Sequence, residues 1–249
     1  MPLWIKICGN TTLADAQLAA DLGADAVGFV FAPSPRQVTP AQAAAIAPLL
    51  PTTLEKIGVF VDASFDEIAQ TIQTASLTGV QLHFNAPPEL SAQLRIRFGA
   101  GLRILRVLHF DPAPSAIENP TRGKLKGTGF SPYIDSHIEE GTLAPDSLLT
   151  DPNTDAILVD SRTPTKVGGT GKAFDWNLAA DTLFQKVKER KLIAAGGLTP
   201  DNVTGAISIL RPWGVDVVSG VESSPGRKDP AKLRAFIANA RAGAVATGL

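Results

Sequence analysis

Short runs of apolar residues recur along the chain, and segments with helical start signals separate most of them. The runs are rich in Val, Ile and Leu, and most are apolar at successive positions, which is typical of parallel strands covered on both faces. We expect eight strands, at residues 4–9, 26–31, 56–61, 79–84, 102–110, 156–161, 191–197 and 215–222. Eight strands alternating with helices in 249 residues predict an α/β fold, a (β/α)8 TIM barrel forming a single domain over residues 1–249. A doubly wound open sheet is the alternative, but it usually has fewer strands, and no GxGxxG motif follows the first strand.

Explicit signals mark the ends of several predicted helices. Residues 39–42 (TPAQ) and 64–67 (SFDE) have the spacing of a capping box. Thr199 and Asp229 each precede a proline, and we expect each to cap the helix that follows. Gly23 follows a helical run at the position where a C-terminal cap is needed.

Two segments depart from the regular alternation. The chain between Phe110 and Ala156 contains six prolines and has a weak helical period. We expect an irregular insertion at about 111–155 in place of the fifth helix, because the segment has too few large apolar residues for a small domain of its own. We expect the last residues, at about 242–249, to form a frayed C-terminal tail.

Composition narrows the class of protein. The 23 basic and 24 acidic residues leave a net charge of −1, which gives no reason to expect a nucleic acid or a membrane as partner. The sequence contains no run of about 18 apolar residues, so we expect no membrane span. The first residues lack the apolar core of a signal peptide. The single cysteine cannot form an internal disulfide, so we expect a soluble, cytoplasmic protein.

The active site of such a barrel lies at the carboxyl ends of its strands. Cys8 lies at the end of the first predicted strand and Asp160 at the end of the sixth, so they can face each other across the barrel mouth. A thiolate can remove a carbon-bound proton, and a carboxylic acid can donate one. Both residues also have structural alternatives, Cys8 as a small buried side chain and Asp160 as the cap of the next turn.

Glycines follow the last two predicted strands. Gly196 and Gly197 end the seventh strand, and Ser219 and Gly220 lie at the end of the eighth. Backbone N–H groups beside such glycines can approach an anion closely, and barrels often hold a phosphate at this place. We therefore expect a phosphate site there, with tight turns as the alternative reading.

Two loops carry further candidates. Gly169, Thr170 and Gly171 follow the sixth strand and could form a lid or a second anion contact, or only a flexible loop. Arg36 lies in a proline-rich loop after the second strand. A guanidinium on a stiff loop suits the bidentate capture of a carboxylate, and a surface ion pair is the competing interpretation.

The histidines do not predict a metal site. His83 and His109 lie at the ends of different predicted strands and are far apart in the sequence. No carboxylate pattern accompanies them. His137 lies in the irregular insertion, where we expect it to be solvated.

Several motifs together resemble the phosphoribosylanthranilate isomerases, a family of tryptophan biosynthesis. The motifs are KICGNT (6–11), GFVFAPSPRQV (28–38), IGVFVDAS (57–64), VQLH (80–83), LVDS (158–161), GGTGKAFDW (168–176), AAGGLTPDNV (194–203) and GVDVVSGVESSPGRKDP (214–230). They cover all eight predicted strands in order, and KICG and the last motif are specific to this family. The sequence departs from the family at Phe84, where glycine is usual, and in the longer segment 110–155.

The resemblance implies an Amadori rearrangement of N-(5′-phosphoribosyl)anthranilate to 1-(2-carboxyphenylamino)-1-deoxyribulose 5-phosphate. It assigns the general base to Cys8 and the general acid to Asp160. Arg36 would contact the anthranilate carboxylate, Gln81 and His83 would be further substrate contacts, and the glycine-rich strand ends would take the phosphate. No cofactor and no metal is implied, because the nitrogen of the substrate is the electron sink.

Other functions stay open from the sequence. A related isomerase of histidine biosynthesis performs the same rearrangement with two aspartates, and a cysteine at the first strand argues against it. A non-catalytic barrel that binds sugar phosphates would keep the glycines without needing both Cys8 and Asp160. In each case the partner is a small molecule, and the chain could be a monomer or a homodimer.

Overall fold

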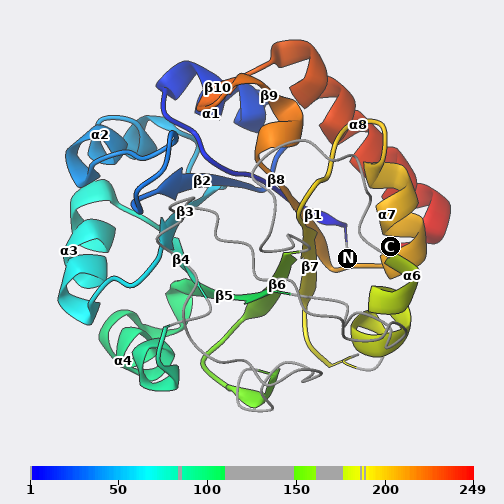
Figure 1. Ribbon diagram of the computed structural model, residues 1–249. Coiled ribbons are helices and arrows are strands. Elements are labelled where there is room, and N and C mark those ends of the chain that lie inside the picture. Colours follow the sequence, from blue (N-terminus) through cyan, green and yellow to red (C-terminus); the bar gives the residue numbers. More distant parts are fainter. Residues whose placement is uncertain (1, 84–85, 110–148, 161–175, 186, 188) are drawn as a thin grey trace, which may run out of the picture.

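The protein, represented by a computed structural model, is a closed barrel of eight parallel strands with helices around it. The structure describes residues 2–83, 86–109, 149–160, 176–185, 187 and 189–249. The strands follow one another around the barrel in chain order, and the last pairs with the first. Figure 1 shows the strands at the centre and the helices outside them. All eight predicted strands are confirmed, and the open sheet is excluded.

The strands of the barrel are β1 (Trp4–Ile7), β2 (Ala26–Val30), β3 (Glu55–Phe60), β4 (Gly79–Leu82), β5 (Arg103–His109), β6 (Ala156–Asp160), β7 (Leu192–Ala195) and β8 (Gly214–Val217). The α-helices are α1 (Leu13–Asp21), α2 (Pro40–Ala44), α3 (Phe65–Ala75), α4 (Pro88–Phe98), α6 (Trp176–Ala179), α7 (Val203–Leu210) and α8 (Pro230–Thr247). Short helices are η1 (Ala47–Leu49), η2 (Gly99–Gly101), η3 (Ala180–Phe184) and η4 (Ser219–Val221). After η4, β9 (Glu222–Ser224) and β10 (Arg227–Lys228) form a two-stranded antiparallel hairpin.

The strands are buried on both faces, which explains their nearly continuous apolar runs. One cluster of buried apolar residues consists of strand side chains: Trp4, Ala26, Ile57, Leu105, Val107, Ala156, Leu158, Ile193 and Ala195. A second, larger cluster joins strands to helices and includes Ile5, Ile7 and Phe236. Because neighbouring side chains of a strand point to opposite faces, the first cluster fills the barrel and the second packs the helices onto it.

The two predicted capping boxes are present. Thr39 accepts a hydrogen bond from the backbone N–H of Gln42, whose side chain accepts one from the backbone N–H of Thr39. Ser64 and Glu67 exchange the same pair of bonds at the start of α3. Each box satisfies two backbone N–H groups that a helix start leaves without a partner.

One predicted cap is wrong. Helix α7 begins at Val203 with Asn202 at its N-cap position, not with Thr199. The side chain of Asn202 instead accepts a hydrogen bond from the N–H of Thr199 and donates one to the carbonyl of Gly197. The residues before α7 are therefore used to order the loop that follows β7, rather than to start the helix.

Helix α8 corrects the prediction of a frayed tail at 242–249. The helix continues to Thr247, whose carbonyl oxygen accepts a hydrogen bond from Arg211. A Cβ at Gly243 would lie 3.3 Å from the Cα of Thr204 in α7. The small residues that suggested fraying allow α8 to pack closely on its neighbour.

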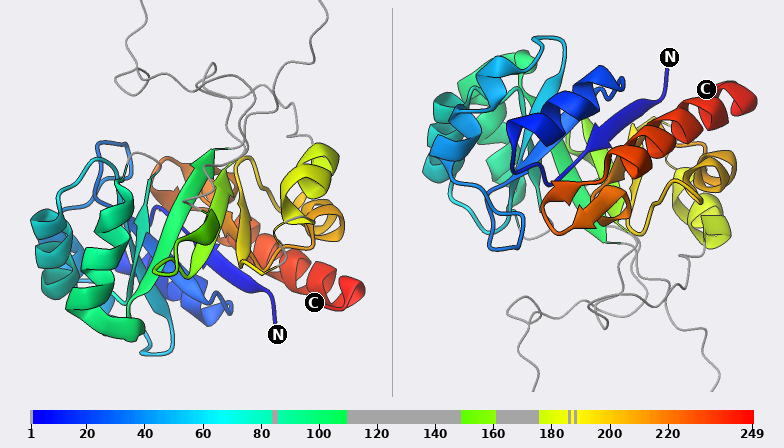
Figure 2. Two further views of the ribbon diagram at one scale, coloured as in Figure 1. Left: turned by 90° about the horizontal axis from the view of Figure 1, so that it is seen from below. Right: turned by 90° about the horizontal axis from the view of Figure 1, so that it is seen from above.

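The same helix fastens the start of the chain. Arg241 donates hydrogen bonds to the carbonyl oxygens of Leu3 and Gly23 and forms an ion pair with Asp25 at 2.8 Å. Figure 2 shows that both chain ends lie on the same side of the barrel. Helix α8 thus holds the residues that lead into β1 and β2.

The predicted insertion at 111–155 is described only in its last part, because residues 110–148 lie outside the described ranges. Just before β6, the Asp151 carboxylate accepts hydrogen bonds from the N–H of Asn153 and the hydroxyl of Thr154. This turn leads the chain into β6, which carries Asp160.

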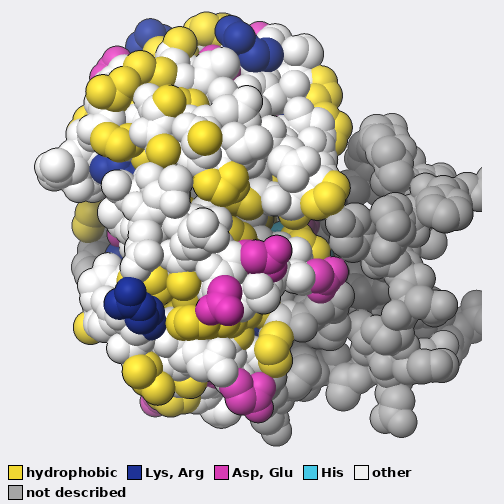
Figure 3. Space-filling view, turned by 90° about the vertical axis from the view of Figure 1, so that its left-hand side faces the viewer, with side chains coloured by type: hydrophobic (Ala, Val, Ile, Leu, Met, Phe, Trp, Pro, Cys, Tyr) yellow, Lys and Arg dark blue, Asp and Glu magenta, His cyan; other side chains and the backbone are white. Residues whose placement is uncertain are grey.

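The surface carries charges of both signs. Figure 3 views the side of the barrel formed by α2 and α3, where small groups of basic and acidic side chains lie among hydrophobic ones. Among the helices that the structure describes, none is long and apolar enough to cross a membrane.

Candidate active site

The predicted site residues gather at one end of the barrel. Cys8 directly follows β1, and Asp160 is the last residue of β6. All carboxyl ends of a parallel barrel lie on the same rim. On the shorter way around the barrel, β7 and β8 separate the two strands. Cys8 and Asp160 therefore reach the mouth from different sides, which is the placement that the sequence predicts.

Cys8 is buried where β1, β2 and β8 meet. Its N–H donates to the carbonyl of Val217 at 2.9 Å, which extends the pairing of β1 with β8. Its side chain packs against β2 at Gly28, where a Cβ would lie 2.5 Å from the sulfur. The thiol therefore occupies space that only a glycine at this position leaves open.

A buried ion pair lies next to this thiol. Lys6 is fully buried, and its Nζ lies 2.9 Å from Oδ1 of Asp216, its register partner on β8. Burial alone would lower the pKa of Lys6, but Asp216 and, to a smaller extent, Cys8 raise it above its ordinary value of 10.5. A charged ammonium group is thus held inside the barrel, within interaction range of the Cys8 side chain. The sequence analysis missed this pair, although a lysine within the apolar run WIKI is a visible signal.

Asp160 is also buried, with 4% of its surface exposed. Its register partners are His109 on β5 and Ala195 on β7. The Asp160 carboxyl group therefore lies at the rim, between the ends of β5 and β7.

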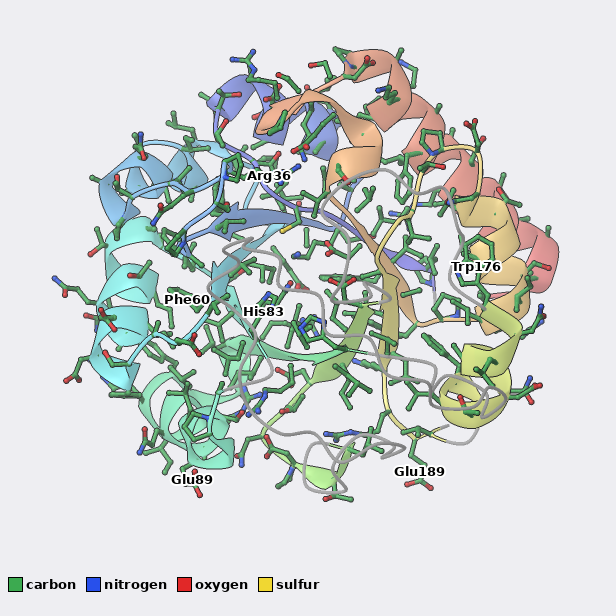
Figure 4. The ribbon with its side chains drawn as sticks, viewed as in Figure 1. Arg36, Phe60, His83, Glu89, Trp176 and Glu189 are labelled. Carbon is green, nitrogen blue, oxygen red and sulfur yellow. The ribbon has the colours of Figure 1, made fainter. Side chains whose placement is uncertain are left out.

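The two described histidines come together at the mouth. The ring centres of His83 and His109 lie 5.9 Å apart, so the inference from their sequence separation is wrong about their distance. Parallel pairing of β4 with β5 brings the two strand ends side by side. Figure 4 shows His83 over the centre of the barrel. Among the described residues, no three His, Cys, Asp or Glu side chains are grouped to hold a metal ion.

Gln81 presents an unsatisfied acceptor. It is buried on β4, and its Oε1 has no hydrogen-bond partner among the residues that the structure describes. Leaving a buried polar group unpaired typically costs about 1–3 kcal/mol. A ligand that donates an N–H or O–H group to this oxygen would recover that free energy.

Arg36 forms an ion pair with Glu222, which is the competing interpretation of this residue. Its Nε lies 2.9 Å from Oε1 of Glu222, and its Nη2 lies 2.7 Å from Oε2 of the same carboxylate. The Arg36 side chain is 22% exposed and that of Glu222 is 4% exposed. Figure 4 shows Arg36 on the rim near β2. The pairing partner belongs to the β9–β10 hairpin, which the sequence analysis did not identify.

Lys228 joins this pair to Cys8. Its Nζ is fully buried, lies 3.3 Å from Oε1 of Glu222 and donates to the carbonyl oxygen of Cys8 at 2.6 Å. Burial lowers the pKa of Lys228, and Glu222 and Cys8 partly oppose this shift. Both charged residues lie in the motif SGVESSPGRKDP, but no spacing rule marks them as partners of an arginine after β2.

The glycine-rich loops after β7 and β8 lie against each other. Gly196 and Gly197 have left-handed φ values of +80° and +65°, which favour glycine. A Cβ at Gly220, in the turn that begins at Ser219, would lie 1.9 Å from the carbonyl oxygen of Leu198. Around Gly197 the same construction meets no atom within 4 Å. The two loops therefore touch at Leu198 and Gly220, and the space beside Gly197 is open.

The remaining sequence candidates lie outside the described residues. These are Gly169, Thr170 and Gly171, together with Phe84 and His137. Their roles stay as predictions.

Comparison with known proteins agrees with this geometry. The profile of the family "N-(5'phosphoribosyl)anthranilate (PRA) isomerase" matches residues 5–119 and 132–239. An N-(5'-phosphoribosyl)anthranilate isomerase of Pelobacter propionicus is 38% identical over 234 residues, covering 94% of this chain and 93% of that protein. One of Geobacter metallireducens is 37% identical over 240 residues, covering 96% of this chain and 98% of the relative.

Solved structures give the same answer. The phosphoribosyl anthranilate isomerase of Thermotoga maritima matches with a TM-score of 0.74 and 33% identity, covering 96% of this chain and 99% of that one. A phosphoribosyl anthranilate isomerase bound to reduced 1-(o-carboxyphenylamino)-1-deoxyribulose 5-phosphate matches with a TM-score of 0.71 and 31% identity, covering 96% and 99%. With its barrel, its rim residues and these relatives taken together, the chain belongs to the phosphoribosylanthranilate isomerase family.

Proposed function

We propose that this chain converts N-(5′-phosphoribosyl)anthranilate into 1-(2-carboxyphenylamino)-1-deoxyribulose 5-phosphate, with Cys8 and Asp160 as the proton-transfer pair. Family membership supports the reaction, as does the product-like ligand bound to one of the similar structures. The observation that carries the assignment is the placement of a buried thiol and a buried carboxyl group on one rim.

Asp160 acts first in the proposed sequence. It donates a proton to the ring oxygen of the ribose, so the bond from that oxygen to C1′ breaks. The lone pair of the nitrogen then forms the C1′=N double bond of a Schiff base. The protonated imine draws electrons from C2′, which makes the hydrogen on that carbon acidic.

Cys8 acts second. Its thiolate removes the C2′ proton, and the electrons of the broken C–H bond form the C1′=C2′ double bond of an enolamine. Protonation at C1′ and loss of the O2′ proton give the ketone, so atoms and charge balance over the isomerisation. The cations Lys6, Arg36 and Lys228 all interact electrostatically with the Cys8 side chain.

The other rim residues would bind the substrate. Arg36 is assigned to the anthranilate carboxylate, because a guanidinium matches a carboxylate in both charge and geometry. Gln81 and His83 are assigned to the sugar and the linking nitrogen. For Gln81 the support is a buried acceptor that has no partner within the described part of the chain.

The phosphate of the substrate is assigned to the loops after β7 and β8. In this proposal the backbone N–H groups of Gly197, Ser219 and Gly220, with the neighbouring Gly196, hold the phosphate, as glycine-rich strand ends often do in barrels. No metal or redox cofactor is assigned a role in this scheme, because the substrate nitrogen accepts the electrons.

The remaining expectations concern context. One similar structure is described as monomers made from a dimeric isomerase of Thermotoga maritima, and we infer that this chain works as a monomer or a homodimer. Its single buried cysteine suits the reducing cytoplasm.

An isomerase assay tests the proposed function. The purified chain, made in a host that lacks the endogenous isomerase, is given freshly formed N-(5′-phosphoribosyl)anthranilate, and the product is detected through the next enzyme of the pathway. Turnover is expected in the parent chain and is expected to be lost in Cys8→Ser. Tight binding of the substrate without turnover would indicate a non-catalytic sugar-phosphate-binding barrel, and turnover only of the corresponding histidine-pathway substrate would indicate the other isomerase.

A further inference from the structure

The guanidinium of Arg36 already uses one of its edges. Its Nε donates to Glu222 at 2.9 and 3.1 Å, and its Nη2 donates to Oε2 of Glu222 at 2.7 Å. A guanidinium has five N–H groups in a fixed plane. The contact with Glu222 therefore uses the Nε–Nη2 edge and leaves the Nη1–Nη2 edge, with three N–H groups, for another acceptor.

Glu222 orients Arg36 without cancelling the positive charge of the site. Two cations, Arg36 and Lys228, share the single Glu222 carboxylate, so the three groups together keep one positive charge. Burial alone would raise the pKa of Glu222, but hydrogen bonds from Arg36, together with Lys228, lower it below its ordinary value. The carboxylate is therefore ionised at neutral pH, and an anionic ligand still meets a net attraction.

The carboxylate is itself held by the hairpin to which it belongs. The N–H of Gly226 donates to Oε1 of Glu222 at 3.2 Å across the β9–β10 turn. Gly226 has a φ of +81°, which favours glycine, and its carbonyl accepts a hydrogen bond from Thr11 at 2.6 Å. The hairpin is thus anchored to the loop after β1, close to Cys8.

Lys228 connects the same hairpin to the backbone of the proposed base. Its Nζ donates to the carbonyl of Cys8 at 2.6 Å and lies 3.4 Å from the carbonyl of Val218. These bonds hold Cys8, which follows β1, against Val218, which follows β8. A shift in the Lys228 side chain would therefore move the Cys8 backbone, while a change in Glu222 would release Arg36.

We propose that Glu222 and Lys228 are positioning residues that set two parts of the site separately. Glu222 turns the free edge of Arg36 toward the carboxylate of the substrate, and Lys228 holds the backbone of Cys8 in place for proton removal. This inference rests on the proposed roles of Arg36 and Cys8. It adds a substrate-specificity function for the β9–β10 hairpin.

Two substrates separate the two effects. One is N-(5′-phosphoribosyl)anthranilate, and the other is N-(5′-phosphoribosyl)aniline, which lacks the ring carboxylate. In Glu222→Gln we expect kcat/KM for the anthranilate substrate to fall about 10- to 100-fold, mainly through KM, since one charge-assisted contact is misaligned. For the aniline substrate we expect a change of less than about threefold, as no carboxylate has to be captured.

Lys228→Met is expected to give the other pattern. Its kcat should fall about 10- to 100-fold for both substrates, because displacement of a reacting group by about 1 Å can cost this much. Arg227→Met is the matched control. Arg227 lies on the same hairpin, its side chain is 60% exposed, and its Nε lies 3.6 Å from Oδ2 of Asp15. Both substrates should be turned over by this control at the parent rate.

For each variant, kcat/KM is measured for both substrates on the same protein sample. The fraction of folded enzyme therefore cancels in the ratio of the two values. Arg36→Ala supplies the reference ratio. If Arg36→Ala loses no preference for the carboxylate substrate, the proposed role of Arg36 is wrong. If Arg36→Ala loses that preference but Glu222→Gln keeps it, the role of Glu222 alone is overturned. Equal losses for both substrates in Glu222→Gln would likewise overturn it, because the residue would then act only through general stability.

A Lys228→Met variant with parent kcat would overturn the role of Lys228.

Discussion

Gly28 and Cys8 are in such close contact across β1 and β2 that a methyl group at residue 28 would lie 2.5 Å from the sulfur. The same methyl group would lie 3.1 Å from the Cα of Cys8. The backbone at residue 28 is not in the left-handed region, so the restriction comes from the space taken by the thiol. A substitution here is therefore a direct way to move the proposed base without removing it.

We expect Gly28→Ala to lower kcat about 100-fold, since the sulfur has to shift away from the added methyl group. The measurement is kcat with the natural substrate, together with a urea unfolding curve. Gly58→Ala is the control, because its Cβ would crowd Leu77 and Phe60 at 2.7 Å but does not touch Cys8. Overpacking should cost both variants about 1–3 kcal/mol of stability. Equal kcat in the two variants would show that the position of the sulfur is unimportant.

Removal of either proposed proton-transfer group should slow the reaction strongly. Positioned acid–base groups typically contribute about 10²–10⁴ in rate, so Cys8→Ser and Asp160→Asn should each lose at least about 100-fold in kcat. Both changes nearly keep the side-chain volume, so melting temperatures should stay close to that of the parent. A Cys8→Ser enzyme within a few-fold of the parent rate would reduce Cys8 to a packing residue.

The proposed phosphate site predicts inhibition by inorganic phosphate. Competitive inhibition is expected in the parent, and it should weaken in Gly220→Ala, whose Cβ would be placed 1.9 Å from the carbonyl oxygen of Leu198 and so push the two loops apart. KM should rise in this variant more than kcat falls. Gly205→Ala, whose Cβ would lie 3.4 Å from Trp176 in ordinary contact, should bind phosphate like the parent. Equal inhibition of all three proteins would place the phosphate elsewhere.

The Lys6–Asp216 pair predicts a pH-dependent stability. Lys6→Met leaves a buried carboxylate without its partner, which typically costs about 3–5 kcal/mol, and the double variant with Asp216→Leu should recover much of this loss. The folded protein raises the pKa of Lys6, so the contribution of the pair is complete below the unfolded value of about 10.4. It is lost as pH rises through the folded value.

Urea unfolding between pH 6 and 11 checks this behaviour. The difference between the parent and Lys6→Met should be constant up to about pH 10 and should shrink only above it. If the difference in the free energy of unfolding already fell between pH 6 and 8, the pH dependence would come from a titratable group other than Lys6.

The barrel itself could be predicted from the sequence because its signals are local. Runs of Val, Ile and Leu mark the strands, and motifs such as SFDE and TPAQ mark helix starts through contacts within four residues. The prediction of a frayed tail at 242–249 is wrong for the same reason. Gly and Ala residues suggest weak local structure, while the packing of Gly243 on α7 depends on a helix far away in the sequence.

The site could be predicted only in part. Positions at strand ends locate Cys8 and Asp160 on one rim, because the topology of the barrel decides this. The partners of Arg36 and Cys8 depend on contacts across more than 180 positions, and no local pattern encodes them. The closeness of His83 and His109 likewise follows from the pairing of β4 with β5, not from their spacing in the sequence.

The bond from Lys228 to Cys8 spans 220 positions, and the pair of Lys6 with Asp216 spans 210. The chain up to residue 228 therefore has to be synthesised before the surroundings of the thiol can form. Contacts of such long range form late, after the loop-closure entropy has been overcome. A nascent or prematurely terminated chain that lacks the hairpin keeps Cys8 but lacks the contact of Lys228 with its carbonyl oxygen, so we expect such a chain to be inactive although it contains the proposed base.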